Sequence, residues 1–400
     1  MGYLPVWWDG HFASHRRTER NACLTNCLDG SKPWSASIAK ESKDAIVMGS
    51  TLGRYFRITT FGESHGPAVG VTVVGVPAGL EVDEDAIQRE LDRRRPGTSP
   101  FVSSRRERDR VEIISGVSDG KSLGSPISLL VRNEDARSDD YDEIRRLFRP
   151  GHADFTYFKK YGIPPLPGGG RASGRETVGR VAAGAIAKAF LKPRGIEVHA
   201  YTVSIGHIEI GKVDRAFAER DPLRCADPDK AEEMAELVRE VQSQGDSIGG
   251  TVEVIVEGVP PGLGDPVFRK LDAMLAGALM SIGAVKGVEF GKGFALTRMK
   301  GSESNDPISA EGFRSNNAGG VLGGISTGQP IVMRLAVKPT ASISKAQSTI
   351  DIEGRDRIIQ VHGRHDPCLC PRIGPVAEAM VALVLADALL QRRAETGADV

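Results

Sequence analysis

The segment Gly70-Val-Thr-Val-Val-Gly-Val-Pro-Ala-Gly-Leu80 returns later in the chain as Gly250-Thr-Val-Glu-Val-Ile-Val-Glu-Gly-Val-Pro-Pro-Gly-Leu263. Each copy is a valine-rich run, which favours a β-strand, and each ends in a Gly-Val-Pro-x-Gly-Leu turn. A stretch with helical spacing follows each turn, opened by Asp83 in the first copy and by Asp265-Pro266 in the second. The repetition predicts a chain with two similar halves.

A second pair of markers supports the duplication. Gly124–Ile127 (Gly-Ser-Pro-Ile) and Gly328–Ile331 (Gly-Gln-Pro-Ile) each precede an apolar strand pattern, and they occur in the same order as the first pair. If the first match were only the chance recurrence of one turn, a second match in the same order would not be expected. Strands and helices are mixed without the strict alternation of a Rossmann chain, and no P-loop sequence is present, so the predicted class is α+β. Further helical patterns are expected at about 173–190, 227–245 and 375–393.

Composition disfavours two kinds of partner. The 400 residues include 52 basic and 52 acidic side chains, so the chain lacks the basic excess typical of proteins that bind nucleic acid through its phosphates. An uninterrupted apolar run of roughly 20 residues, which a membrane span needs, does not occur. The nearest candidate, 376–390, contains Glu378 and Asp387 and is better interpreted as a buried helix. We therefore expect neither a nucleic acid nor a membrane partner.

The first 47 residues differ from the remainder. They hold all three tryptophans and two of the five cysteines, and a strong strand pattern begins only after Met48. We interpret residues 1–47 as a disordered leader or a non-native start, and residues 48–400 as one catalytic domain made of two halves. A targeting arm is the alternative, but several acids in the segment argue against a transit peptide. The scattered cysteines lack zinc-site spacing and favour free thiols in a reducing cytoplasm.

Two glycine-containing turns present histidines. Gly62–Gly66 (Gly-Glu-Ser-His-Gly) follows a strand pattern and places His65 between glycines, where it could transfer a proton near neutral pH. A purely structural histidine is an equally good interpretation of that turn. In Arg149–Asp154 (Arg-Pro-Gly-His-Ala-Asp), proline and glycine fix a turn that presents Arg149, His152 and Asp154 together.

A glycine loop and an arginine-rich run suggest anion binding. Gly168–Glu176 leads into a predicted helix through a Ser173–Glu176 capping box, so free amides and Arg171 would lie at a helix N-terminus. Eight arginines and no lysine occur between Arg89 and Arg110, and the planar guanidinium suits phosphates and carboxylates. A solvated, salt-bridged face accounts for most of these arginines. A few lining a pocket would suit a small polyanion.

A third candidate segment lies near the C-terminus. In Gly363–Pro367 (Gly-Arg-His-Asp-Pro), Asp366 has Arg364, His362 and His365 as neighbours, which would keep its carboxylate ionised and available as a base.

Together these segments resemble the chorismate synthase family from about Met48 to the C-terminus. The family's three recognisable stretches are similar to Gly62–Pro77, Gly168–Ala185 and Arg364–Glu378, in the same order, joined by Arg149–Asp154 and Lys338–Ser342. The resemblance implies a sandwich of helices and antiparallel sheets built from an internal repeat, and a cytoplasmic homotetramer.

The resemblance also implies an activity. Members eliminate phosphate and a proton from 5-enolpyruvylshikimate 3-phosphate, which makes them carbon–oxygen lyases of the shikimate pathway of aromatic amino-acid biosynthesis. They require reduced FMN although the reaction has no net redox change. Because no segment resembles a flavin reductase domain that would use NADPH, an external flavin reductase or another source is expected to supply the reduced FMN.

The family's functional residues are carried over by motif. His65 would assist phosphate departure, His152 would protonate the reduced flavin, and Asp366 would help the flavin accept the substrate's proton. The residues implied to bind substrate are Arg94, Arg105, Arg149, Arg171 and Arg364. Those implied to bind the flavin are Arg171, Ala172, Ser173, Ala284, Gly323, Lys338, Pro339, Thr340, Ala341, Ser342 and Arg364.

The chain departs from the family pattern at two positions. Pro100 stands where many relatives carry an arginine, so one contact to substrate or nicotinamide is lost or supplied by a neighbour, and Gly283 replaces the usual Asn or Pro. Two other functions are possible: a phosphate- or RNA-binding module that uses the arginine-rich segment, and a phosphatase-like hydrolase. The hydrolase would need a metal cluster or an activated nucleophile, and the sequence suggests neither.

Overall fold

The computed structural model describes residues 49–105, 107–134, 145–361, 363 and 365–397. The predicted leader 1–47 lies outside these residues, as do Arg364 and His362 of the C-terminal motif. All of the described residues belong to the compact unit that follows Val47.

The first half of the fold is a five-stranded antiparallel sheet with two helices. Its strands run in the order β1-β2-β3-β7-β4. Helix α2 follows β3, begins at its N-cap Asp83 as predicted, and ends at Arg94; helix α4 follows β7. The bounds are β1 (Thr51–Leu52), β2 (Arg57–Gly62), β3 (Ala68–Val74), α2 (Glu84–Arg94), β4 (Val111–Ser115), β7 (Ile127–Arg132) and α4 (Thr177–Leu191).

The second half repeats this arrangement. Its sheet has the order β11-β16-β10-β8-β9 and is also antiparallel. Both halves have the sequence strand, strand, helix, strand, strand, helix, and β2-β3-β7-β4 corresponds to β8-β10-β16-β11 in spatial order. The predicted α+β class with an internal duplication is confirmed. The bounds are β8 (Glu197–Ile205), β9 (Ile208–Glu209), β10 (Gly250–Glu257), α7 (Leu271–Met280), β11 (Val285–Phe290), β16 (Ile331–Val337) and α9 (Cys370–Thr396).

Shorter elements complete the described chain. Helix α3 begins at Asp154 of the candidate site, helix α6 buries Met234 and Val238 in the core, and the remaining elements are shorter. Their bounds are β5 (Val117–Ser118), β6 (Lys121–Ser122), α3 (Asp154–Tyr161), α5 (Arg215–Ala218), α6 (Ala231–Ser243), α8 (Gly301–Ser304), β12 (Ile308–Ser309), β13 (Gly312–Phe313), β14 (Val321–Leu322), β15 (Ile325–Ser326), β17 (Gln347–Ile350) and β18 (Asp356–Ile359).

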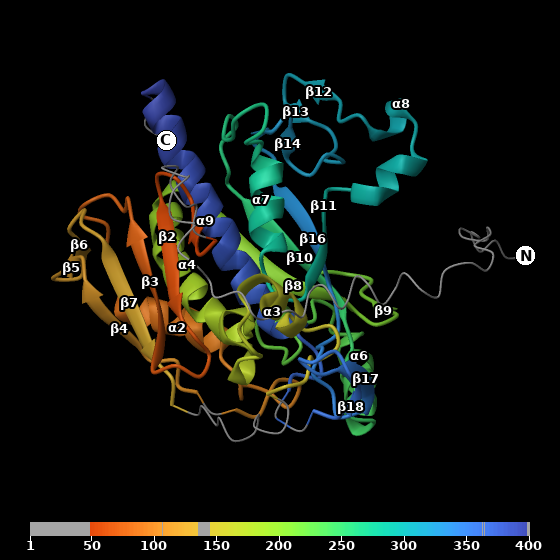
Figure 1. Cartoon of the computed structure of the whole chain (residues 1–400). Helices are drawn as coiled ribbons and strands as arrows, with labels where there is room; N and C mark the ends of the chain where they lie inside the picture. The colour runs from red at the N-terminus through yellow and green to blue at the C-terminus, as the bar shows by residue number, and fades with distance from the viewer. Residues whose placement is uncertain (1–48, 106, 135–144, 362, 364, 398–400) are drawn as a thin grey trace, which may run out of the picture. The chain divides into compact units, whose positions relative to one another are not determined.

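The helices of the two halves pack against each other between the sheets (Figure 1). Helix α4 lies on β3 of the first sheet, helix α9 lies on β8 of the second, and the two helices contact each other closely. At the crossing, a Cβ added to Gly184 would lie 2.4 Å from the Cβ of Ala379, so glycine is required for this approach. The two valine-rich strands supply alternating core residues: Val69, Val71 and Val73 from β3, and Val252, Val254 and Val256 from β10.

Helix α9 is long and apolar enough, by length and composition, to cross a membrane, but 94 % of its most apolar window is buried inside the fold. Its two interior acids have specific partners. Asp387 Oδ1 accepts hydrogen bonds from the backbone N–H groups of Arg54, Tyr55 and Phe56 at 2.6–2.9 Å, and Glu378 pairs with cations of the first half. The predicted buried helix is therefore what the structure contains.

Four helix starts differ from the sequence expectation, and the first is that of α6, which begins at Ala231 and not at Asp227. Helix α4 begins at Thr177 after a short 3₁₀ turn, not at Ser173. Helix α7 begins at Leu271, beyond Asp265-Pro266. Helix α9 begins at Cys370, with Pro371 in its first turn and Pro375 inside the helix. The prediction placed starts at proline or at capping residues, but proline fits any position of a first turn, so its position alone does not fix the start.

Candidate functional site

Two consecutive glycines bring the predicted histidines together. Gly168 and Gly169 have φ values of 63° and 87°, in the left-handed region. A Cβ added to Gly168 would lie 2.1 Å from His65 Cε1, and one added to Gly169 would lie 2.7 Å from His152 Cε1. The backbone of this loop therefore lies against both imidazole rings, which come from turns 87 residues apart in the sequence.

His65 is held by its neighbour on the turn after β2. Ser64 Oγ lies 3.1 Å from His65 Nδ1 and 3.4 Å from the carbonyl oxygen of Pro167, which belongs to the glycine loop. Ser64 is only 1 % exposed, so its hydroxyl is confined to these partners. The contact with Ser64 therefore holds the imidazole ring of His65 through its Nδ1 atom.

The Arg149–Asp154 turn forms the compact cluster that the sequence predicts. Asp154 Oδ1 lies 2.8 Å from His152 Nδ1, and both Asp154 oxygens accept from the Arg149 guanidinium at 2.7 and 2.8 Å. Burial opposes ionisation of Asp154, but the hydrogen bonds from Arg149 and His152 hold its pKa well below the usual value. The carboxylate therefore orients His152 through Nδ1, with Nε2 beside Gly169.

Asp366 is held by groups other than those that the sequence suggests. Its Oδ1 accepts from the backbone N–H of Ser103 and its Oδ2 from Arg372 Nη1, both at 2.8 Å. Burial, reinforced by nearby Arg149, lowers the pKa of His365 to about 4, so this ring is neutral at neutral pH and supplies no positive charge to Asp366. The other two neighbours that the sequence suggests, Arg364 and His362, lie outside the described residues.

Most of the predicted flavin-binding segment lies beside this cluster. The backbone N–H of Lys338 donates to the carbonyl of Ala284 at 2.9 Å, and Thr340 Oγ1 donates to the carbonyl of Asp366 at 2.7 Å. A Cβ added to Gly151, next to His152, would lie 3.5 Å from Ala341 Cβ. Burial, with help from Lys286, lowers the pKa of Lys338. Pro339 and the buried Ser342 complete the segment.

Gly323 is the exception among these positions. It lies in the turn between β14 and β15, where the carbonyl of the next residue, Gly324, accepts from Leu271 at the first residue of α7. Ala284 follows the opposite end of that ten-residue helix, which spans about 15 Å. Within one chain, the fold does not bring Gly323 to Ala284 and Lys338.

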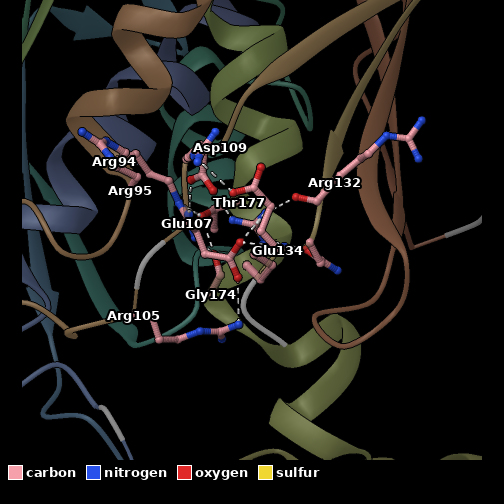
Figure 2. Close-up of polar contacts among 12 residues, drawn as sticks. Arg94, Arg95, Arg105, Glu107, Asp109, Arg132, Glu134, Gly174 and Thr177 are labelled. Carbon is pink, nitrogen blue, oxygen red and sulfur yellow. Dashed lines mark hydrogen bonds and ion pairs between the residues drawn. The ribbon is translucent and has the colours of Figure 1, made fainter. Parts of the chain in front are cut away.

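Arg94 lies inside the protein, in a network of buried ion pairs (Figure 2). It contacts Asp109 at 3.1 Å, Thr177 Oγ1 at 3.0 Å and the carbonyl of Gly174. Burial, followed by repulsion from Arg372, lowers its pKa to about 9. Its guanidinium is committed to protein groups, so the structure supports an organising role, and its contact with substrate remains a prediction.

Arg105 and Arg171 are partly exposed. Arg105 lies 3.0 Å from Glu107 and is 21 % exposed. Arg171 donates to Thr60 Oγ1 at 2.6 Å and to the carbonyl of Gly62 at 3.2 Å, which fixes the end of β2 just before the His65 turn.

The glycine loop enters α4 without the predicted capping box. Ser173 Oγ accepts from the N–H of Arg175, two residues on, at 3.2 Å. The Glu176 carboxylate accepts from Thr60 Oγ1 and Arg180 Nε, each at 2.7 Å. Glu176 is used to join β2 to α4, so it does not bond back to Ser173 as a capping box requires. Ala172 lies between Arg171 and this cap.

A cavity of about 450 Å³ opens beside His365, the residue that precedes Asp366. Its walls are formed in part by the loop 97–104, which includes Pro100, and in part by the C-terminal motif. The lining residues are Gly97, Ser99, Pro100, Val102, Ser104, Gln242, Gly363 and His365.

Sequence reasoning missed Gln242 and Arg372. For Arg372 a signal existed, since it is a lone cation at the start of an apolar helix. Among the described residues, no group of three or more His, Cys, Asp and Glu side chains could hold a metal ion.

Comparison with known proteins decides the family. The family model described as chorismate synthase matches residues 56–390. The chain belongs to the chorismate synthase family. It is 54 % identical to a chorismate synthase of Syntrophus aciditrophicus over 88 % of this chain and 100 % of that protein, and 56 % identical to one of Nitratidesulfovibrio vulgaris strain Hildenborough over 87 % and 98 %. A crystal structure of chorismate synthase is 37 % identical, with a TM-score of 0.69, and covers 85 % of this chain and 93 % of its own. The recognition of this enzyme family from sequence is confirmed.

Proposed function

We propose that the protein is a chorismate synthase that eliminates phosphate and a proton from 5-enolpyruvylshikimate 3-phosphate in the presence of reduced FMN, acting as a carbon–oxygen lyase. The observation that carries the proposal is the approach of Gly168 and Gly169 to both His65 and His152. It gathers two proton-carrying side chains beside the Arg149–Asp154 ion pair. Family membership supports the same activity.

The residues present fit a flavin mononucleotide. The cavity of about 450 Å³ is of the size of ligand sites, about 300–1,000 Å³, and polar side chains of Gln242 and His365 are among its lining. Lys338 is a half-buried cation suited to a phosphate. Lys338–Ser342, Ala284 and Arg171–Ser173 would hold the flavin, and Arg364 and Gly323 remain predictions of the resemblance. When bound, reduced FMN would supply the redox-active ring that the elimination requires, with no net change in the oxidation state of the flavin or the substrate.

The chain's own groups divide the proton and charge transfers. His65, fixed by Ser64, would deliver a proton to the departing phosphate. His152, oriented by Asp154, would hold the proton that keeps the bound flavin in its required state. Asp366, held on both oxygens, would assist acceptance of the substrate's proton. Arg149 and Arg105, together with the buried Arg94, would balance the negative charge of a substrate that carries a phosphate and two carboxylates.

Other features of the proposal rest on family resemblance. We propose a cytoplasmic homotetramer that receives reduced FMN from an external reductase or another source, with 48–400 as the catalytic domain. Because Pro100 lines the cavity and cannot donate to an anion, the contact that an arginine makes in many relatives would be lost or made by a neighbouring residue.

A phosphate- or RNA-binding module is the weaker alternative. Its main support was the arginine run, but the described arginines there are largely paired with acids. The pairs are Arg89–Asp83, Arg93–Glu378, Arg94–Asp109, Arg95–Asp92, Arg105–Glu107 and Arg108–Glu134. A run neutralised in this way offers little charge to a polymer of phosphates.

The proposed activity is tested by anaerobic turnover of 5-enolpyruvylshikimate 3-phosphate with chemically reduced FMN. We expect phosphate release with equal formation of chorismate, and no release with oxidised FMN or without flavin. Phosphate release without chorismate, or release independent of reduced FMN, would point to a hydrolase. Salt-sensitive RNA binding with no turnover would favour the binding module.

A further inference from the structure

Arg372 makes a nearly buried ion pair with Asp366. It is the third residue of α9, and its Nη1 lies 2.8 Å from Asp366 Oδ2. The side chains are 17 % and 10 % exposed, respectively, so solvent screens the pair only weakly. A charge-assisted hydrogen bond of this length restricts the direction in which the carboxylate can point.

The same guanidinium reaches a second element. Arg372 Nε donates to the carbonyl oxygen of Arg94, the last residue of α2, at 3.2 Å. The loop that follows α2 supplies the other partner of Asp366, because the N–H of Ser103 donates to Oδ1 at 2.8 Å. Arg372 and Ser103 thus hold Asp366 from opposite oxygens, and both are tied to the α2 end and the loop that walls the cavity.

We propose that Arg372 is the positioning residue for Asp366: it sets the orientation of the carboxylate and its distance from the loop 97–104. The proposal rests on the proposed function, in which Asp366 assists proton acceptance. Two donor nitrogens at a fixed angle make both contacts at once, which a lysine cannot do. Lysine at this position would keep the charge and one hydrogen bond while losing the contact to Arg94.

The contacts distinguish positioning from substrate binding. The charge of Arg372 faces the carboxylate of Asp366, and the titratable groups close to this pair among the described residues include Arg94, Asp109 and His365. Both guanidinium contacts of Arg372, to Asp366 Oδ2 and to the carbonyl oxygen of Arg94, are made to protein atoms. Arg372 therefore acts through Asp366, and its loss should change the rate of the chemical step more than the affinity for substrate.

The test compares Arg372→Met, Arg372→Lys, Asp366→Asn and the double variant R372M/D366N with wild type. We expect Arg372→Met to lower kcat by about 10²-fold, the scale of a misplaced reacting group, with KM changed by less than about threefold; Arg372→Lys should recover part of the loss. The double variant should be no slower than Asp366→Asn, because the two residues act as one unit. Arg392→Met, on the same helix with a bond to the carbonyl of Pro261, is the control and should leave kcat unchanged.

A second readout does not depend on turnover. Hydrogen–deuterium exchange at the Ser103 amide should accelerate in both Arg372→Met and Asp366→Asn but not in Arg392→Met. A rise in KM with unchanged kcat, additive losses in the double variant, or unchanged Ser103 exchange would overturn the proposal. If wild type itself gives no chorismate, the proposed function fails, and the exchange experiment still decides whether Arg372 positions Asp366.

Discussion

Replacing Gly168 with alanine should lower kcat/KM by about 10²–10⁴-fold, the usual contribution of a general acid, in a protein that remains folded. The new Cβ would lie 2.1 Å from Cε1 and 2.3 Å from Nδ1 of His65, so the ring must move away from the glycine loop and from Ser64. His65 then can no longer reach the departing phosphate. The measurement is phosphate release under reduced FMN, with His65→Ala as the benchmark for complete loss of the imidazole.

Gly162 provides the matched control. Its φ is 69°, close to the 63° of Gly168, but a Cβ added there meets nothing within 4 Å. Both alanine variants incur the left-handed strain of about 1–2 kcal/mol, and only Gly168→Ala displaces His65. Equal activity losses in the two variants would show that backbone strain alone is responsible, and full activity of Gly168→Ala would exclude the proposed role of the loop.

The fold could be predicted to the level of its duplication because the decisive signals are local. The valine-rich runs at 70–80 and 250–263 became β3 and β10, the central strands that each pair with two neighbours. The helix starts were less predictable. Ser173 and Glu176 satisfy a capping-box pattern, but Glu176 bonds to Thr60, 116 residues away, because the packing of β2 on α4 offers a stronger buried partner.

The candidate site was predictable as separate turns and not as an arrangement. The turns at His65, His152 and Asp366 each carry a local sequence signal. The donors that fix Asp366 do not, since the Ser103 amide is 263 residues away and a backbone N–H has no sequence signature. The arginine run shows the opposite error: the sequence predicts a solvated, salt-bridged face for most of these arginines, whereas Asp109 and Glu107, which pair with Arg94 and Arg105, are buried.

Replacing Glu378 with glutamine should lower the free energy of unfolding by about 3–5 kcal/mol, the cost of removing one partner from a buried ion pair. Glu378 is 1 % exposed in α9. Its carboxylate accepts hydrogen bonds from both Nη atoms of Arg93 at 2.6 and 2.9 Å and from Nζ of Lys188 at 2.6 Å. It also accepts from the N–H of Ala200 in β8 at 3.0 Å. One carboxylate therefore joins α2 and α4 of the first half to β8 and α9 of the second, and its neutralisation leaves buried cations undercompensated. Denaturant unfolding measures the loss.

The loss of unfolding free energy at acid pH (the acid limb) separates the role of the Glu378 charge from simple packing. Burial opposes ionisation of Glu378, but Lys188 and Arg93 lower its pKa far below the usual value. A depressed folded pKa gives stability that is present above the unfolded value of about 4.3 and is lost as pH falls towards the folded value. Wild type should thus lose stability below about pH 4 more steeply than Glu378→Gln, whose amide does not titrate. Glu219→Gln, which removes a 46 % exposed partner of Arg93, should cost about 1 kcal/mol or less. Parallel acid limbs for wild type and Glu378→Gln would show that the charge of Glu378 does not hold the two halves together.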